Sequence, residues 1–314
     1  LLYFANLFFD FSFFYDIIQV SSDFAHINKR NIMIIVIVCD ILGKKNNGTS
    51  IASYNLINSL KEKGHSVKVV CCDLDESENN ENGQFIVLNK LNLGPLNKIV
   101  ERNGVSLPLK DKKKIIEAIK GCDIVHVMLP FPLGITACRI AKRLGKPVTA
   151  GFHCQAELVS SHLGLMNCEP FNTHIYKQFY KHLYQYCDAV HYPTKFICDV
   201  FENIVGRTNH YIISNGVNKY MTYKPCEKPD DLKDKFIILS TGRLCKEKSH
   251  ITLFEAVALS KHNSEIQLII AGQGPLQKRL EKYAEENIVN PPIIKYFFRS
   301  EMANLVNYAD LYVH

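Results

Sequence analysis

The chain has 314 residues, of which 47% are hydrophobic and 22% are charged, and its formal net charge is +6. This composition is typical of a globular protein, and the length suffices for two domains of ordinary size. The Lys and Arg residues are scattered, which argues against a nucleic-acid partner and favours a phosphorylated ligand or an anionic membrane surface.

Residues 1–31 form an aromatic and apolar extension that Asp10 and Asp16 interrupt. Its apolar run is shorter than the ~20 residues of a spanning helix, and it lacks the basic leader and cleavage site of a signal peptide. We expect upstream sequence translated ahead of a start near Met33. The alternative is an anchor that lies on a membrane.

From Ile32 onward, apolar strands alternate with amphipathic helices. Residues 32–40 are a β-branched run, which predicts a strand covered on both faces of a parallel sheet. A glycine-containing turn at 46–50, a helix over 51–64 and a strand over 65–72 complete a βαβ unit. Further strands are expected at 122–129, 147–153, 189–194 and 210–216, and helices at 134–146, 175–187 and 195–205.

A polar segment with two prolines, residues 217–235, is expected to be a linker. Beyond it we expect strands at 236–241, 265–272, 293–298 and 310–313 and helices at 251–261, 275–287 and 301–309. The pattern predicts an α/β fold of two Rossmann-like, doubly wound parallel-sheet domains that face each other across a cleft. The N-terminal domain would cover 32–216, and an incomplete C-terminal domain would cover 236–314.

The 11 cysteines show no disulfide or metal-binding pattern. Cys71 and Cys72 are adjacent, the others stand alone, and no C-x-x-C pair occurs. We interpret them as reduced, mostly buried thiols of a cytosolic protein and expect no metal site, in preference to a disulfide framework.

The stretch "STGRLCKEK" places positive charge at the end of a predicted strand. Gly242 ends the strand, and Arg243 and Lys248 follow. A guanidinium and an ammonium group at this position can neutralise a diphosphate. The alternative is a loop of solvated basic residues.

Two further glycine turns follow strands. In "IIAGQGPLQKRL" Gly272 ends a strand, Gly274 permits a tight turn and Pro275 is expected to open a helix, whose first N–H groups suit an anion or a ribose. In "IISNGVN" the pair Asn215-Gly216 ends a strand before the linker. Each turn alone is weak evidence, because many strand-to-helix turns need glycine.

Taken together, "ISNGVN", "STGRLCKEKS", "LIIAGQGPLQKRLEKYA" and "LVNYADLYV" resemble the C-terminal half of the family 4 (group 1) glycosyltransferases of the GT-B fold. "IVCDILGKKNNGTSIASYNLINSLKEKGHSVKVV" and "VTAGFHCQAE" resemble its N-terminal half. The resemblance covers about residues 32–314. It implies a hexosyltransferase that moves a sugar from a nucleoside-diphosphate sugar to an acceptor with retention of configuration and without a metal or other cofactor.

The resemblance also implies roles for individual residues. Arg243 and Lys248 would hold the diphosphate. The remaining donor-binding positions would be Gly48 and Thr49, which face the phosphates and the sugar, and Asn215, Gly216, Gly242, Gly272 and Gly274, which belong to the nucleotide cleft.

His153 matches the active-site histidine of the family, which contacts the sugar or the acceptor. The alternative is a buried histidine at a strand end that the backbone satisfies. Glu157 follows four residues later and is given no role.

The chain departs from the family pattern at its end. The family carries two glutamates beyond this point, one for the donor sugar and one for the ribose, and the sequence stops before them. We therefore expect a C-terminally truncated fragment whose activity is low or absent.

The acceptor is expected to be a lipid or a saccharide in bacterial cell-envelope glycan or glycolipid synthesis. Residues 110–120 carry Lys110, Lys112, Lys113, Lys114 and Lys120 beside three isoleucines. Such a helix could rest on anionic lipid, or it could pack on the core with solvated lysines. The expected location is cytoplasmic, with peripheral contact at the inner face of the membrane.

Other functions remain as alternatives. A nucleotide-sugar epimerase shares the fold, and a truncated domain could bind nucleotide without turnover. A dinucleotide-dependent oxidoreductase would need G-x-G-x-x-G after the first strand, and "CDILGKKNNG" lacks that spacing.

Overall fold

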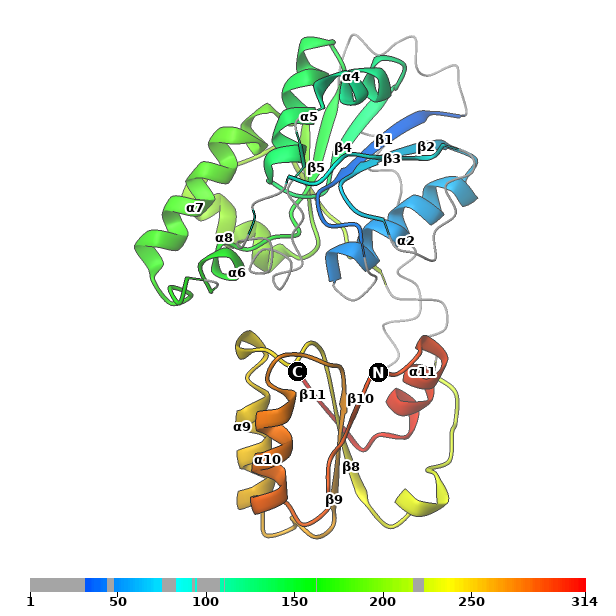
Figure 1. The fold of residues 1–314 in the computed structure, drawn as a ribbon, viewed down its shortest axis with the longest axis vertical. Helices are drawn as coiled ribbons and strands as arrows, with labels where there is room; N and C mark the ends of the chain where they lie inside the picture. Colours follow the sequence, from blue (N-terminus) through cyan, green and yellow to red (C-terminus); the bar gives the residue numbers. More distant parts are fainter. Residues whose placement is uncertain are drawn as a thin grey trace. The chain divides into compact units, whose positions relative to one another are not determined.

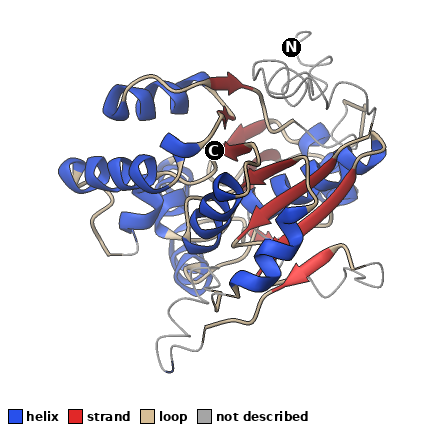
Figure 2. Cartoon of the chain, turned by 90° about the horizontal axis from the view of Figure 1, so that it is seen from above, coloured by secondary structure: helices blue, strands red, loops and turns tan. Residues whose placement is uncertain are grey.

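The computed structural model describes residues 32–43, 48–74, 83–91, 94, 108–109, 111–161, 163–216 and 223–314. The described chain forms two compact units, the first of which ends at Gly216 (Figure 1). Both contain a parallel sheet with helices around it (Figure 2), which confirms the expected fold class. The expected extension at 1–31 and the linker residues 217–222 lie outside the described residues.

The first unit holds a seven-stranded sheet in the order β3-β2-β1-β4-β5-β6-β7, and each neighbouring pair is parallel. The order reverses between β1 and β4, which is the point where ligands bind in doubly wound sheets. The strands are β1 (Ile34–Cys39), β2 (Ser66–Cys71), β3 (Phe85–Val87), β4 (Ile124–Val127), β5 (Val148–Gly151), β6 (Ala189–Tyr192) and β7 (His210–Ile212).

Helices connect these strands. The described ones are α2 (Gly48–Glu62), α4 (Lys112–Lys120), α5 (Pro132–Arg143), α6 (Ala156–Ser161), α7 (Glu169–His182) and α8 (Lys195–Val205). Strand β1 is buried almost throughout, as its apolar sequence requires, because helices cover the central strands of a parallel sheet. Each fully buried aliphatic side chain contributes about 1.5–3 kcal/mol to this core.

The second unit holds a four-stranded parallel sheet in the order β10-β9-β8-β11. Its strands are β8 (Phe236–Thr241), β9 (Ile266–Ala271), β10 (Ile293–Lys295) and β11 (Leu311–Val313), and its helices are α9 (His250–Leu259), α10 (Gln277–Asn287) and α11 (Arg299–Tyr308). Phe254 of α9 and Leu280 of α10 pack with Ile238 on one face, whereas Leu305 of α11 packs with Leu239 on the other. Alternate residues of β8 thus face two separate cores.

Three local expectations need correction. Gly48 and Thr49 belong to the first turn of α2 and not to a turn that precedes the helix. Helix α10 begins at Gln277 and not at Pro275, because Gln277 N–H first closes a turn onto Gly274 O at 3.1 Å. Strand β3 and helix α6 were not expected.

The basic segment near residue 110 forms α4. Ile115 and Ile119 are buried in the core of the first unit, whereas Ile116 is exposed. Because the apolar face packs inward, α4 follows the core-packed alternative rather than the membrane-resting one. Lys110 lies outside the described residues. Among the residues that the structure describes, no helix has both the length and the apolar character needed to span a bilayer.

Candidate functional site

The ends of β8 and β9 meet backbone to backbone in the second unit. Gly242 N–H donates to Ala271 O at 3.1 Å, and a β-carbon on Gly272 would lie 1.9 Å from Gly242 O. Gly242 itself has a φ of +138°, a conformation that favours glycine. The contact therefore requires glycine on both strand ends for geometric reasons.

The contact between the two strand ends continues one step further along each loop. Leu244 N–H donates to Gln273 O at 3.1 Å, and Leu276 N–H donates to Leu244 O at 3.1 Å. A β-carbon on Gly274 would lie 2.4 Å from Leu244 O. We call the backbone segments 242–244 and 272–276 the glycine junction. It brings together Gly242, Gly272 and Gly274, the three positions of this unit that the resemblance assigns to the nucleotide cleft.

Arg243 belongs to this junction, and Lys248 lies close to it. Arg243 is half-buried and Lys248 is exposed. The methylene groups of Lys248 lie against Gly242, where a β-carbon would meet Cε at 3.5 Å, and Lys248 Nζ lies 3.5 Å from Nε2 of His314. The structure thus places Arg243 in the backbone of the glycine junction and the Lys248 side chain against it, at the carboxyl end of the sheet.

His250 was not singled out from the sequence, although it follows Lys248 closely. It is the first residue of α9 and is 4% exposed, and its Nδ1 is buried without a hydrogen-bond partner among the described residues. Burial, then Lys248 and His314, lower the pKa of His250, so the ring stays neutral. A neutral imidazole at a helix start offers a polar group without adding charge.

In the first unit, Asp40 at the end of β1 joins the strand to helix α5. Its carboxylate accepts hydrogen bonds from Leu133 N–H at 2.9 Å and Gly134 N–H at 3.3 Å. Burial raises the pKa of Asp40 to about 7 although these two bonds oppose the shift. Sequence reasoning missed this residue, whose partners lie more than ninety positions away.

His153 follows β5 and folds back over the strand end. A β-carbon on Gly151 would lie 2.4 Å from His153 Nε2, so the ring occupies the space above that glycine. The preceding Phe152 is 2% exposed, and its ring centroid lies 4.6 Å from that of Phe201 and 5.2 Å from that of Tyr184. This aromatic anchor fixes the backbone from which His153 projects.

Two more histidines lie on the neighbouring strands β4 and β6. The ring centroids of His153 and His191 are 5.7 Å apart, and His126 Nδ1 lies 2.8 Å from Thr149 Oγ1. Burial, followed by the neighbouring His191, lowers the pKa of His153 well below its usual range, so the imidazole is neutral. The sequence signal for this cluster was a histidine in each of two predicted strands.

The other predicted positions are placed separately. Gly48 is exposed at the first position of α2, and Thr49 is half-buried beside it. Asn215 and Gly216 lie beyond β7, where Gly216 has a φ of +71°. Glu157 accepts a hydrogen bond from the Tyr176 hydroxyl at 2.5 Å. The first unit thus carries His153, Gly48, Thr49 and the Asn215-Gly216 turn, and the second carries the glycine junction with its two cations.

Two family models match the chain. The model described as Glycosyltransferase Family 4 matches residues 46–219, and that described as Glycosyl transferases group 1 matches residues 227–314. The first alone covers more than half of the chain.

Individual proteins are similar to the chain over parts of their length. The alpha-monoglucosyldiacylglycerol synthase of Streptococcus pneumoniae is 23% identical over 185 residues, which are 55% of this chain and 41% of that protein. The chain therefore matches less than half the length of this relative.

Solved structures show the same fold at low identity. The Anabaena protein Alr3699/HepE, in complex with UDP and glucose, is 14% identical with a TM-score of 0.65, over 90% of this chain and 74% of that one. WaaG, a glycosyltransferase involved in lipopolysaccharide biosynthesis, is 16% identical with a TM-score of 0.62, over 89% of this chain and 74% of that one.

Proposed function

The chain belongs to glycosyltransferase family 4, group 1, and on that premise we propose that it transfers a hexosyl group from a nucleoside-diphosphate sugar to a lipid or saccharide acceptor with retention of configuration. The observation that carries the proposal is the glycine junction with Arg243 and Lys248 beside it. Glycines have no side chains, so they leave room for a nucleotide to lie close to the backbone of the junction. The positive charges of Arg243 and Lys248 suit a diphosphate.

In this proposal the diphosphate is the leaving group. Arg243 would bind its oxygens with the planar guanidinium, and Lys248 would add a compact positive charge. Fixed cations stabilise negative charge as it develops, which lowers the barrier without a metal. The N-terminus of α2, which begins at Gly48 and Thr49, would favour the same negative charge.

His153 would act as a neutral hydrogen-bonding group toward a sugar or acceptor hydroxyl. Its lowered pKa keeps the ring uncharged over the physiological range. The anchored Phe152 would hold the ring in place during the reaction.

The similarity to a glucosyldiacylglycerol synthase supports a lipid acceptor of the diacylglycerol type, in glycolipid synthesis at a membrane surface. An acceptor of this class would bring the protein into peripheral contact with the membrane. A saccharide acceptor is the second candidate, which the fold shared with WaaG supports.

Nucleotide titration tests the donor site. UDP or GDP is expected to bind, and NAD is not. Arg243→Ala and Lys248→Ala should each weaken binding about 10-fold to 100-fold, since a hydrogen bond to a charged group contributes about 1.5–3 kcal/mol. Lys246→Ala is the matched control, because Lys246 is exposed in the same short turn. Equal effects of all three changes would contradict the assignment.

Product analysis separates the transferase from its alternatives. Incubation of donor and acceptor should yield a glycoside with the anomeric configuration of the donor, and the reaction should continue in EDTA. An epimerase would convert the donor without an acceptor. A nucleotide-binding domain would bind UDP or GDP and form no product.

A further inference from the structure

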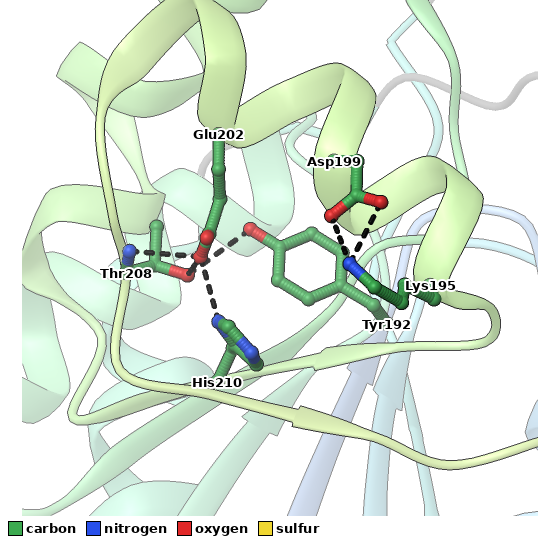
Figure 3. Close-up of polar contacts among 6 residues, drawn as sticks. All are labelled: Tyr192, Lys195, Asp199, Glu202, Thr208 and His210. Atoms are coloured by element: carbon green, nitrogen blue, oxygen red, sulfur yellow. Dashed lines mark hydrogen bonds and ion pairs between the residues drawn. The ribbon is translucent and has the colours of Figure 1, made fainter.

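A cysteine, a glutamate and a histidine come together away from the residues discussed so far. Cys198 and Glu202 lie one turn apart on α8, and His210 begins strand β7. The three ligand atoms they offer all lie within 4.8 Å of one another. Figure 3 shows Glu202 and His210 turned toward each other between the helix and the strand.

The carboxylate of Glu202 is held in a fixed orientation. Its Oε1 accepts hydrogen bonds from Thr208 N–H at 2.9 Å and from the Thr208 hydroxyl at 2.6 Å, and it lies 2.7 Å from His210 Nδ1 (Figure 3). The Thr208 hydroxyl also lies 3.2 Å from the Tyr192 hydroxyl. Such outer partners orient a carboxylate in the way that second-layer groups orient metal ligands.

The other two groups are also positioned. The His210 ring packs edge-on against Tyr192 with centroids 5.8 Å apart, which leaves Nδ1 directed at Glu202. Cys198 is 2% exposed, and its Sγ lies within 4.8 Å of the ligand atoms of Glu202 and His210. The side chains of Glu202 and His210 are 16% and 25% exposed. The cluster is thus ordered on the protein side and open to solvent on the other.

We propose that Cys198 Sγ, the Glu202 carboxylate and His210 Nδ1 bind a zinc ion, with a water molecule as the fourth ligand. Sulfur, nitrogen and oxygen donors in a three-residue set suit Zn²⁺ in tetrahedral geometry. Magnesium and calcium prefer oxygen ligands alone, so the thiolate selects against them. On binding, the thiol proton passes to solvent. The proton that His210 Nδ1 donates to Glu202 is also released there, and His210 takes up a proton on Nε2, so the ring is neutral.

The zinc ion would link the end of α8 to β7. Cys198 and Glu202 come from the helix and His210 from the edge strand, so one ion would hold together elements that otherwise meet through the Glu202 hydrogen bonds. None of the three residues belongs to the proposed donor site. The site therefore does not depend on the proposed transfer reaction, and it departs from the expectation that the cysteines take part in no metal site.

The experiment begins with protein stripped by EDTA and dialysed. Zinc titration against a competing chromophoric chelator should show a single high-affinity ion per chain. Cobalt(II) is the spectroscopic substitute, and the wild-type protein should give a thiolate-to-cobalt charge-transfer band with the strong visible absorption of tetrahedral cobalt. Absence of this band in the wild-type protein would overturn the proposal without any variant.

Variants assign the ligands. Cys198→Ser and His210→Gln should abolish the high-affinity step, and Thr208→Val should weaken zinc binding about 10-fold to 100-fold through the carboxylate it orients. Cys122→Ser is the matched control, because Cys122 is also buried and lies outside the cluster. Zinc should raise the melting temperature of the wild-type and Cys122→Ser proteins, but not that of Cys198→Ser.

The contrary outcome is equally defined. If wild-type and Cys198→Ser proteins bind zinc with the same affinity and stoichiometry, the cluster is only a hydrogen-bonded link between α8 and β7. Nucleotide binding by Arg243 and Lys248 is measured separately, so failure of the zinc site would leave the proposed function untouched.

Discussion

A β-carbon on Gly151 would lie 2.4 Å from Nε2 of His153, so the imidazole occupies the space that any side chain at position 151 would fill. The last residue of β5 and the histidine after it therefore form one structural unit. Glycine at 151 is explained by the ring that covers it. The relationship makes the position of His153 testable without changing His153 itself.

Gly151→Ala should displace the His153 ring and reduce kcat/KM about 100-fold, because a shift of about 1 Å in a positioned group can cost this much. The free energy of unfolding should change little, because the new β-carbon meets ring atoms of His153, which can move aside. Turnover and thermal unfolding measure the two effects. Gly121→Ala is the control, because a β-carbon there meets nothing within 4 Å. Unchanged turnover in Gly151→Ala would remove His153 from the site.

Gly272→Ala should disrupt the glycine junction. The new β-carbon would lie 1.9 Å from the Gly242 carbonyl oxygen, which belongs to the backbone and cannot move aside by a change of rotamer. We expect a loss of roughly 1–3 kcal/mol of unfolding free energy, in the range of other overpacking changes, and a loss of nucleotide binding. Urea unfolding and UDP titration test both. A variant with wild-type stability and affinity would show that the two strand ends do not approach this closely.

Ser249→Gly should stabilise the protein by roughly 0.5–1 kcal/mol. Among the described residues, Ser249 is the one non-glycine residue with a positive φ, which is 48°. Its side chain makes no capping hydrogen bond to α9. A side chain at positive φ has a steric cost that glycine avoids. This gain exceeds the extra conformational entropy that glycine loses on folding. Calorimetry should show a higher Tm. Ser260→Gly, at a φ of −69°, should show no such gain.

Asp40 should make stability fall as the pH rises. Its pKa is raised by burial to about 7, so between pH 4 and 7 the folded chain keeps a proton that the unfolded chain has released. The free energy of unfolding should then decrease by up to about 1.4 kcal/mol per pH unit in this range. Asp40→Asn removes this contribution and keeps an oxygen for Leu133 N–H. Urea unfolding across the range compares the two slopes, and parallel curves would refute the coupling.

The sequence alone was sufficient for the local features. The apolar runs and helical periods predicted nearly every strand and helix, and the glycines were expected at the strand ends where the structure has them. These features can be predicted from the sequence because each depends on a few consecutive residues. Arg243 and Lys248 were identified for the same reason, since both follow one strand and lie within a short turn.

Only the tertiary structure decided which strand ends lie side by side. Strand β11 pairs with β8, so Lys228 and Asp310 form an ion pair at 2.6 Å across a long stretch of sequence. His153 meets His191 because β5 and β6 are neighbours in the sheet. Long crossovers join parallel strands, so spatial partners are remote in sequence and no local pattern predicts their meeting. The contacts of Asp40 with α5 arose in the same way.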